Sequence, residues 1–288
     1  PTVAELADVR RQEKYTAAWS SLVPIELDGH KSPLFCIHPI GGNVLEYYCL
    51  AGHLGRDRPI YGLQAQGVDG KQELLDRIED MASYFIKEIK TVQPHGPYLL
   101  IGYSFGGLLA FEIAQQLYRQ GETVDLLGLL DTRSPGLREV NKSFPEYLEI
   151  HLNKIRQLEP IDKIKYCISK INTLFQKKIS YRDRVIANLS RIEMFSPELL
   201  NVLDGNIQAQ QDYIPQVYSG HITIFRSESQ SIYRDLYPEL GWKDLVSGGI
   251  EIEDIPGDHY EMMREPNVQV LVGKLKTRID RETSGTNS

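Results

Sequence analysis

Ser104 is the centre of the pentapeptide GYSFG at residues 102–106, which fits the pattern Gly-x-Ser-x-Gly. A serine hydroxyl is a weak nucleophile at neutral pH, and it attacks an acyl carbon only when a nearby base takes its proton. The pattern is informative where a strand leads into the serine and a helix leaves it. Here the apolar run YLLIGY precedes Ser104, and the amphipathic run FGGLLAFEIAQQLYRQG follows it. We therefore predict that Ser104 is the nucleophile of an acyl-transfer reaction.

The base that would activate Ser104 is expected to follow it in the chain, after an acidic residue. Of the seven histidines, only His221 and His259 lie well beyond the strand that follows the serine. His221 opens a predicted strand, whereas His259 lies in the segment PGDHYEMM, a loop after a strand. This loop is expected at the carboxyl end of the sheet, where Ser104 is also expected. We therefore predict His259 as the base.

Three carboxylates compete for the role of orienting His259. Asp131 ends the strand after the serine-bearing helix, so its side chain is expected at the same sheet edge as Ser104. Glu228 follows the next strand, and Asp258 is adjacent to His259. Adjacent residues rarely present their side chains to each other, which disfavours Asp258. We predict Asp131 as the acid, with Glu228 as the main alternative.

An oxyanion intermediate needs two backbone N–H donors. One is expected from Phe105, the residue after the nucleophile, and the other from a loop after an early strand. The segment HPIGG at residues 38–42 occupies that loop, and its paired glycines permit a turn that directs N–H groups inward. We predict Ile40 or Gly41 as the second donor, and we interpret His38 as a support of this loop rather than as a base.

The elements that position these residues alternate between short apolar runs and longer amphipathic runs. This order predicts an α/β protein with a doubly wound, mostly parallel sheet. The sharp strand-to-helix turn expected around Ser104, known as a nucleophile elbow, indicates an α/β-hydrolase. Predicted strands cover residues 33–38, 59–63, 98–103, 124–131, 221–226 and 249–255. Predicted helices cover residues 44–54, 78–92, 105–119 and 267–280.

The gap between the strands that end at residue 131 and begin at residue 221 is too long for a plain loop. Segments such as YLEIHLNKIRQL show apolar residues at helical spacing. We predict a helical lid insertion over about residues 140–212, above the sheet edge where ligands bind. The hydrolase domain is predicted over 23–282, after a linker at 1–22 and before a frayed tail at 283–288.

Composition narrows the classes of function. The net charge is −7, which provides no general attraction to nucleic acid or to an anionic membrane. The chain has no run of about 18 apolar residues and no basic-then-apolar leader. Its three cysteines are scattered, which predicts reduced thiols in a cytoplasmic protein and neither a disulfide framework nor a metal site. We expect no cofactor of its own.

With these residues in place, the chain resembles the type I thioesterase domains that end nonribosomal peptide synthetases and polyketide synthases. The resemblance covers about residues 20–280, and its motifs are HPIGGN, GYSFGG, AFEIAQQLYRQG, LLGLLDT and GDHYEMM. In that family the acid follows the strand after the nucleophile, which matches Asp131. The opening PTVAELADVRRQ is similar to the tail of a carrier domain and its linker.

The resemblance implies release of an acyl, peptidyl or polyketidyl chain. Ser104 would take the chain from the phosphopantetheine thioester of an upstream carrier domain, then release it to water as an acid or to an internal nucleophile as a ring. Alternatives are a carboxylesterase or lipase of the same fold, a free-standing editing (type II) thioesterase and a non-enzymatic binding module. The long insertion disfavours the editing enzyme, and a complete triad disfavours the binding module.

The stretch from Lys154 to Arg184 is basic within an acidic chain, with nine Lys or Arg against three acids. A solvated helix face explains such a stretch most simply. The other hypothesis is that it attracts the carrier domain or the phosphate of its phosphopantetheine arm.

Overall fold

The computed structural model describes residues 20–135, 196–228 and 237–285, with the single positions 137, 156, 182 and 186. The chain divides into two compact units, one formed by residues 1–135 and 197–288 and the other by residues 136–196. All the predicted site residues belong to the first unit. Most of the predicted lid, including the basic stretch at 154–184 apart from positions 156 and 182, lies outside the described residues, as does the predicted linker up to residue 19.

The first unit is built on a seven-stranded sheet with the order β1-β3-β2-β4-β5-β6-β7. Only β1 is antiparallel to its neighbour, and the other pairs are parallel. The strands are β1 (Leu22–Glu26), β2 (Leu34–Ile37), β3 (Ile60–Leu63), β4 (Tyr98–Tyr103), β5 (Val124–Leu130), β6 (Ile222–Ser227) and β7 (Ile250–Ile255). Because the strands are mostly parallel, the loops that follow them lie at one edge of the sheet, at the carboxyl ends of the strands.

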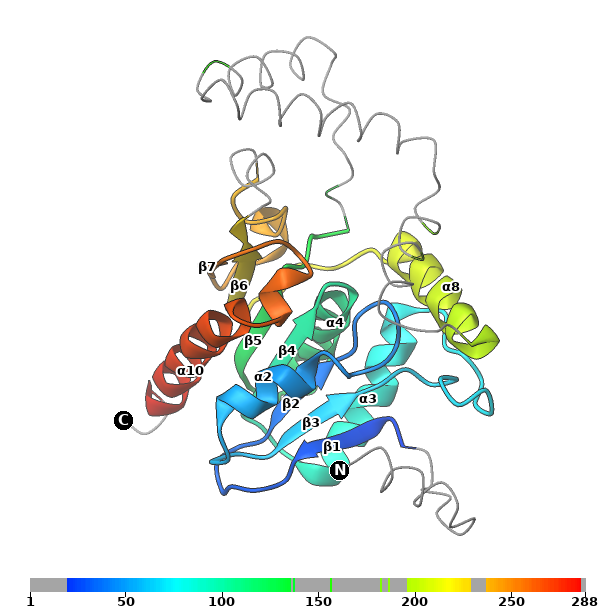
Figure 1. The fold of residues 1–288 in the computed structure, drawn as a ribbon, viewed down its shortest axis with the longest axis horizontal. Helices are drawn as coiled ribbons and strands as arrows, with labels where there is room; N and C mark the ends of the chain where they lie inside the picture. The colour runs from blue at the N-terminus through cyan, green and yellow to red at the C-terminus, as the bar shows by residue number, and fades with distance from the viewer. Residues whose placement is uncertain are drawn as a thin grey trace. The chain divides into compact units, whose positions relative to one another are not determined.

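Helices cover both faces of this sheet (Figure 1). They are α2 (Tyr47–Leu54), α3 (Ile78–Val92), α4 (Phe105–Arg119), α8 (Pro197–Asp212) and α10 (Asn267–Gly285). Two short 3₁₀ turns, η2 (Lys243–Leu245) and η3 (Glu261–Met263), complete the described elements. α2 and α10 pack together on one face, and α3 and α4 pack together on the other.

The two faces follow from the alternation of side chains along the strands. Leu34 and Cys36 of β2 belong to the same buried cluster as the apolar face of α10. Phe35 and Ile37, which alternate with them, are fully buried too. Central strands that are apolar at every position are expected where helices cover both faces. The predicted doubly wound sheet is confirmed.

The structure differs from the predicted elements mainly at the ends of the chain. β1 was not predicted, because the segment LVPIE is short and Pro24 argues against a central strand. β1 is an edge strand, where proline is tolerated, and it begins one residue inside the predicted linker. α10 continues to Gly285, three residues into the predicted tail, because Arg281 and Glu282 favour helix. In the described part of the chain, neither α10 nor any other helix is suited to span a bilayer.

α8 occupies the last 16 residues of the predicted lid. It belongs to the same compact unit as the sheet and contacts α4. Its buried residues include Val202, Leu203 and Asn206. The predicted boundary at 212 therefore includes a helix that is part of the hydrolase unit, and an insertion as a separate unit spans 136–196.

Candidate active site

Ser104 lies in a strained turn between β4 and α4. Its backbone angles are φ 56° and ψ −118°, outside the regions that side chains favour. Glycines make the turn possible, because a Cβ at Gly102 would overlap the Gly106 carbonyl and a Cβ at Gly106 would overlap the Ile37 carbonyl. The turn directs the serine away from the sheet, at the N-terminus of a 15-residue helix.

Three of the predicted residues form a chain of hydrogen bonds. The His259 Nε2 atom lies 3.1 Å from the Ser104 Oγ atom. The His259 Nδ1 atom lies 2.7 Å from the Asp131 Oδ2 atom. If Nδ1 carries the ring proton and donates it to the carboxylate, Nε2 is left as an acceptor for the serine hydroxyl. The structure thus brings Ser104, His259 and Asp131 together in one hydrogen-bonded series.

Asp131 is buried, and its carboxylate is held by more than the histidine. The Ser227 amide donates to Oδ1 at 2.9 Å, and the Ser227 hydroxyl donates to Oδ2 at 3.0 Å. The Asp131 side chain is 0% exposed, whereas that of His259 is 28% exposed. A buried carboxylate requires such donors, because ionisation without them is costly. Asp131 is therefore fixed from β6, while the histidine remains open to solvent on one side.

The alternative acids and base have other surroundings. Asp258 accepts hydrogen bonds from the amides of Tyr260 and Glu261, and the Glu261 side chain accepts one from the Asp258 amide. This reciprocal arrangement is a capping box that starts η3. Glu228 is exposed at the end of β6, and His221 precedes that strand, at the end opposite to Ser227. None of the three is in the hydrogen-bonded series.

Two buried tyrosines support the turn and the base. The Tyr103 hydroxyl donates to the His259 carbonyl at 2.6 Å, and the two rings stack with their centroids 4.9 Å apart. The Tyr47 hydroxyl donates to the Ile37 carbonyl at 2.6 Å and accepts from the Tyr103 amide at 2.9 Å. Burial raises the pKa of both phenols well above their ordinary value. Both hydroxyls therefore stay protonated as hydrogen-bond donors.

The loop after β2 is held by hydrogen bonds that orient its amides. Gly42 donates to the Pro39 carbonyl at 2.9 Å, which closes a turn. The Asn206 side chain of α8 donates to the Ile40 carbonyl at 2.9 Å. In a trans peptide the carbonyl and the next N–H point in opposite directions, so the Gly41 amide points away from Asn206. Phe105 is the first residue of α4, where amides have no partner within the helix.

His38 is fully buried beneath this loop. Its Nδ1 atom lies 2.8 Å from the Pro39 carbonyl, and its ring stacks on Phe105 with centroids 5.8 Å apart. Burial lowers the pKa of His38 to about 4, so the ring is neutral at pH 7. Nε2 has no hydrogen-bond partner among the described residues. These contacts agree with a supporting role for His38 and give it no access to the serine hydroxyl.

The sequence analysis missed Asn206, Ser227 and Tyr47 as contributors to the site. Asn206 lay inside the predicted lid, and Ser227 was one residue beyond a predicted strand. Their roles depend on contacts with residues 166, 96 and 10 positions away. The only sequence signal is positional, because Ser227 ends the strand next to the one that ends before Asp131.

A hydroxyl, an imidazole and a buried carboxylate in this order can perform nucleophilic acyl transfer. The imidazole can take the hydroxyl proton through Nε2, and the carboxylate stabilises the imidazolium that results. Amides at a helix N-terminus can stabilise the negative charge that develops on a carbonyl oxygen.

The comparisons with known proteins agree on one family. The model of the thioesterase domain matches residues 32–279. A dimodular nonribosomal peptide synthase from Bacillus subtilis (strain 168) is 34% identical over 276 residues, which cover 96% of this chain and 11% of that protein. Malpinin synthetase from Mortierella alpina is also 34% identical, over 96% of this chain and 3% of that protein. The chain thus spans a small part of these curated relatives.

Solved structures show the same architecture. A four-domain nonribosomal peptide synthetase, AB3403, matches with a TM-score of 0.70 and 25% identity over 96% of this chain and 21% of that one. The NocB thioesterase domain, in a covalent complex with a fluorophosphonate nocardicin G analogue, matches with a TM-score of 0.64 and 21% identity. That match covers 87% of this chain and 96% of the NocB domain. The predicted α/β-hydrolase fold is confirmed.

Proposed function

This chain belongs to the thioesterase domain family, and we propose that it releases a finished acyl, peptidyl or polyketidyl chain from a carrier domain. The hydrogen-bonded series from Ser104 through His259 to Asp131 carries the proposal. Its relatives that are synthetases support the class of substrate, a thioester on a phosphopantetheine arm. The partner in this proposal is an upstream carrier domain, and the cofactor is the arm of that domain.

In the first half-reaction the Ser104 Oγ atom attacks the thioester carbonyl while His259 Nε2 takes the hydroxyl proton. Negative charge develops on the carbonyl oxygen, and the amides of Phe105 and of Ile40 or Gly41 donate to it. The carbon–sulfur bond then breaks, and His259 returns the proton to the departing thiol. The products are an acyl ester on Ser104 and the free phosphopantetheine thiol.

In the second half-reaction a nucleophile attacks the ester carbon, and His259 takes its proton. Water as the nucleophile gives a carboxylic acid, whereas an amine or hydroxyl of the same chain gives a ring. His259 then returns the proton to Ser104 Oγ as the ester bond breaks. Asp131 stabilises the imidazolium in both halves, because its carboxylate accepts from Nδ1.

Mass spectrometry of the intact chain tests this proposal directly. Incubation with pantetheine thioesters of candidate acyl and peptidyl chains should add the acyl mass to the parent, and the released product is identified as acid or ring. Ser104→Ala should lose the adduct and the turnover completely. Ser83→Ala is the matched control, because Ser83 is an exposed serine of α3 whose hydroxyl bonds the Glu79 carbonyl and the Gln116 side chain.

A parallel panel of p-nitrophenyl esters separates thioester release from the activity of a carboxylesterase or lipase. Chain release predicts a higher kcat/KM for pantetheine thioesters with long chains. Preference for oxygen esters would contradict it, and preference for short aberrant acyl groups would indicate an editing thioesterase. Full turnover by Ser104→Ala would overturn the assignment of the nucleophile.

A further inference from the structure

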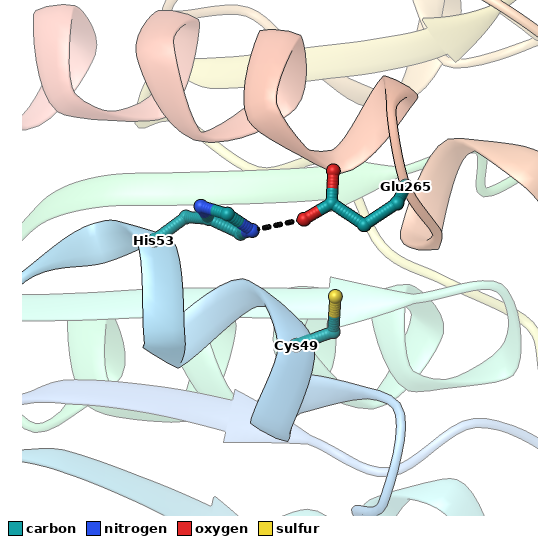
Figure 2. A group of neighbouring side chains, drawn as sticks. All are labelled: Cys49, His53 and Glu265. Carbon is teal, nitrogen blue, oxygen red and sulfur yellow. Dashed lines mark hydrogen bonds and ion pairs between the residues drawn. The ribbon is translucent and has the colours of Figure 1, made fainter.

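Cys49, His53 and Glu265 gather where α2 meets the N-terminus of α10 (Figure 2). Cys49 and His53 are four residues apart on α2, so their side chains lie on one face of the helix. Glu265 comes from the segment between η3 and α10. Figure 2 shows the thiol, the imidazole and the carboxylate directed toward a common point. One sulfur, one nitrogen and one oxygen donor thus converge from two distant parts of the chain.

The spacing of these donor atoms suits a single ion. One ligand atom from each residue lies within 4.8 Å of the others, and the His53 Nε2 atom is hydrogen-bonded to the Glu265 carboxylate. Zinc–ligand bonds of about 2.0 to 2.3 Å in tetrahedral geometry separate neighbouring donors by roughly 3 to 4 Å. Small rotations of the side chains therefore suffice to surround an ion.

The type of donors selects the class of ion. A thiolate and an imidazole are ligands of zinc and of similar transition metals, whereas magnesium and calcium prefer oxygen. Three protein ligands with a water in the fourth position make a complete tetrahedral set. We propose that Cys49, His53 and Glu265 form a binding site for a divalent transition-metal ion of the zinc class, which ties α2 to the N-terminus of α10.

The surroundings of the cluster support ligation. Gln269 donates to the Glu265 Oε2 atom at 2.8 Å, which orients the carboxylate in the manner of residues that surround metal ligands. The His53 side chain is 36% exposed and that of Glu265 is 49% exposed, so an ion can enter from solvent. Cys49 packs partly against the core cluster, which holds its thiol in position.

Binding of the metal ion needs no further reactant. The ion replaces the thiol proton of Cys49, which passes to the buffer, and no oxidation or reduction occurs. The lone pair of His53 Nε2 and one carboxylate oxygen of Glu265 bind the ion, in place of their mutual hydrogen bond. The sequence predicted no metal site because Glu265 lies more than 200 residues from the other two ligands, a separation of 212 from His53.

Cobalt substitution tests the site through its thiolate ligand. Untagged protein, stripped with a chelator, should bind one Co²⁺ per chain with a thiolate-to-cobalt absorption band that Zn²⁺ removes by displacement. Cys49→Ser should lose the band, and His53→Asn should weaken Co²⁺ binding at least tenfold. His95→Asn is the matched histidine control, because the His95 side chain is 87% exposed and lies beside Glu122, away from the cluster. Its band should be unchanged.

A melting experiment separates this site from the triad. Zn²⁺ should raise the Tm of the parent and of His259→Ala, but not of Cys49→Ser, while Mg²⁺ should change none of them. Gln269→Ala should weaken Zn²⁺ affinity about tenfold or more. A band that survives Cys49→Ser, or a Tm shift that is lost in His259→Ala and retained in Cys49→Ser, would overturn the proposal. The outcome does not depend on whether the chain releases thioesters.

Discussion

The carboxyl ends of β4, β5 and β6 differ from the loop after β2 in what holds them. At the strand ends, the Ser104 amide donates to Leu130 at 2.9 Å and the Asp131 amide donates to Phe225 at 2.7 Å. The ladder of the sheet thus runs up to Ser104 and Asp131. The loop at 38–42 has backbone bonds at its two ends, from the His38 amide to Leu63 and from the Ala65 amide to Gly42. Between them the Ile40 carbonyl depends on the side chain of Asn206, which comes from α8.

The two halves of the site are therefore positioned by different interactions, one by the sheet and the other by a side chain from α8. Register within this sheet is set by backbone ladders between strands that are buried on both faces, and a slip of one residue would move every side chain to the opposite face. The Ile40 carbonyl, by contrast, is held by one side chain from a distant helix, so a single substitution removes its donor. Variants in each half should therefore fail in different ways.

Among the residues that support Ser104 and His259, the largest effect is expected at Asp131. Asp131→Asn keeps the shape of the side chain but presents His259 with the wrong partner, so kcat/KM for a pantetheine thioester should fall about ten-thousand-fold. Asp258→Asn, at the neighbouring capping position, should change it less than about tenfold, since asparagine also caps helices. Steady-state kinetics of the two variants make the test, and equal losses would contradict the assignment of Asp131.

In the loop half, His38 should make stability depend on pH. Its pKa in the folded protein is about 4, below the ordinary 6.5, so the unfolded chain takes up a proton that the native protein refuses. The free energy of unfolding should thus fall as pH drops from 6.5 to 4, by up to about 3 kcal/mol. Urea unfolding of the parent and of His38→Asn at pH 7 and pH 4.5 isolates this contribution. Parallel changes in the two proteins would rule it out.

Removing Asn206 should loosen the loop alone. Asn206→Ala leaves the buried Ile40 carbonyl without its donor, at a cost of about 1–3 kcal/mol. Because the Gly41 amide shares that peptide plane, we expect kcat to fall about tenfold with KM little changed. Gln208→Ala is the control, because the exposed Gln208 side chain lies on the same helix and donates to Asp212. A loss confined to KM would indicate that Asn206 acts on substrate binding instead.

The smallest effect is expected at Ser227. Ser227→Ala removes one donor to Asp131, but the Ser227 amide and His259 still hold the carboxylate, so kcat/KM should fall less than about tenfold. Ser227→Thr, which keeps the hydroxyl, should restore most of the loss. A decrease as large as that of Asp131→Asn would mean that the hydroxyl, rather than the sheet, positions the acid.

The sequence predicted what depends on local pattern. Buried strands such as 98–103 are apolar at every position, and Ser104 is marked by glycines that its turn requires. Asp131 and His259 could be predicted because a parallel sheet brings the ends of its strands to one edge. Ile40, Gly41 and Phe105 remain predicted oxyanion donors, since their amides are not part of the hydrogen-bonded series from Ser104 to Asp131.

Asn206 and Tyr47 could not be predicted for a physical reason. Asn206 donates to one backbone carbonyl, and Tyr47 bonds one backbone carbonyl and one backbone amide, all of them on other elements or loops. No periodicity in the sequence records such bonds. β1 could not be predicted because its proline argues against a strand unless the strand is known to lie at the edge of the sheet. The cluster of Cys49, His53 and Glu265 likewise exists only after α2 and α10 have packed together.

Tyr103 gives the site a tolerance to small movements. It directly precedes Ser104 in the chain, and its hydroxyl and ring both hold His259. A displacement of β4 therefore moves Ser104 and, through Tyr103, also acts on His259. The contacts of Tyr103 thus make the separation of the Ser104 Oγ and His259 Nε2 atoms less sensitive to a shift of β4 than it would be if β4 carried the serine alone.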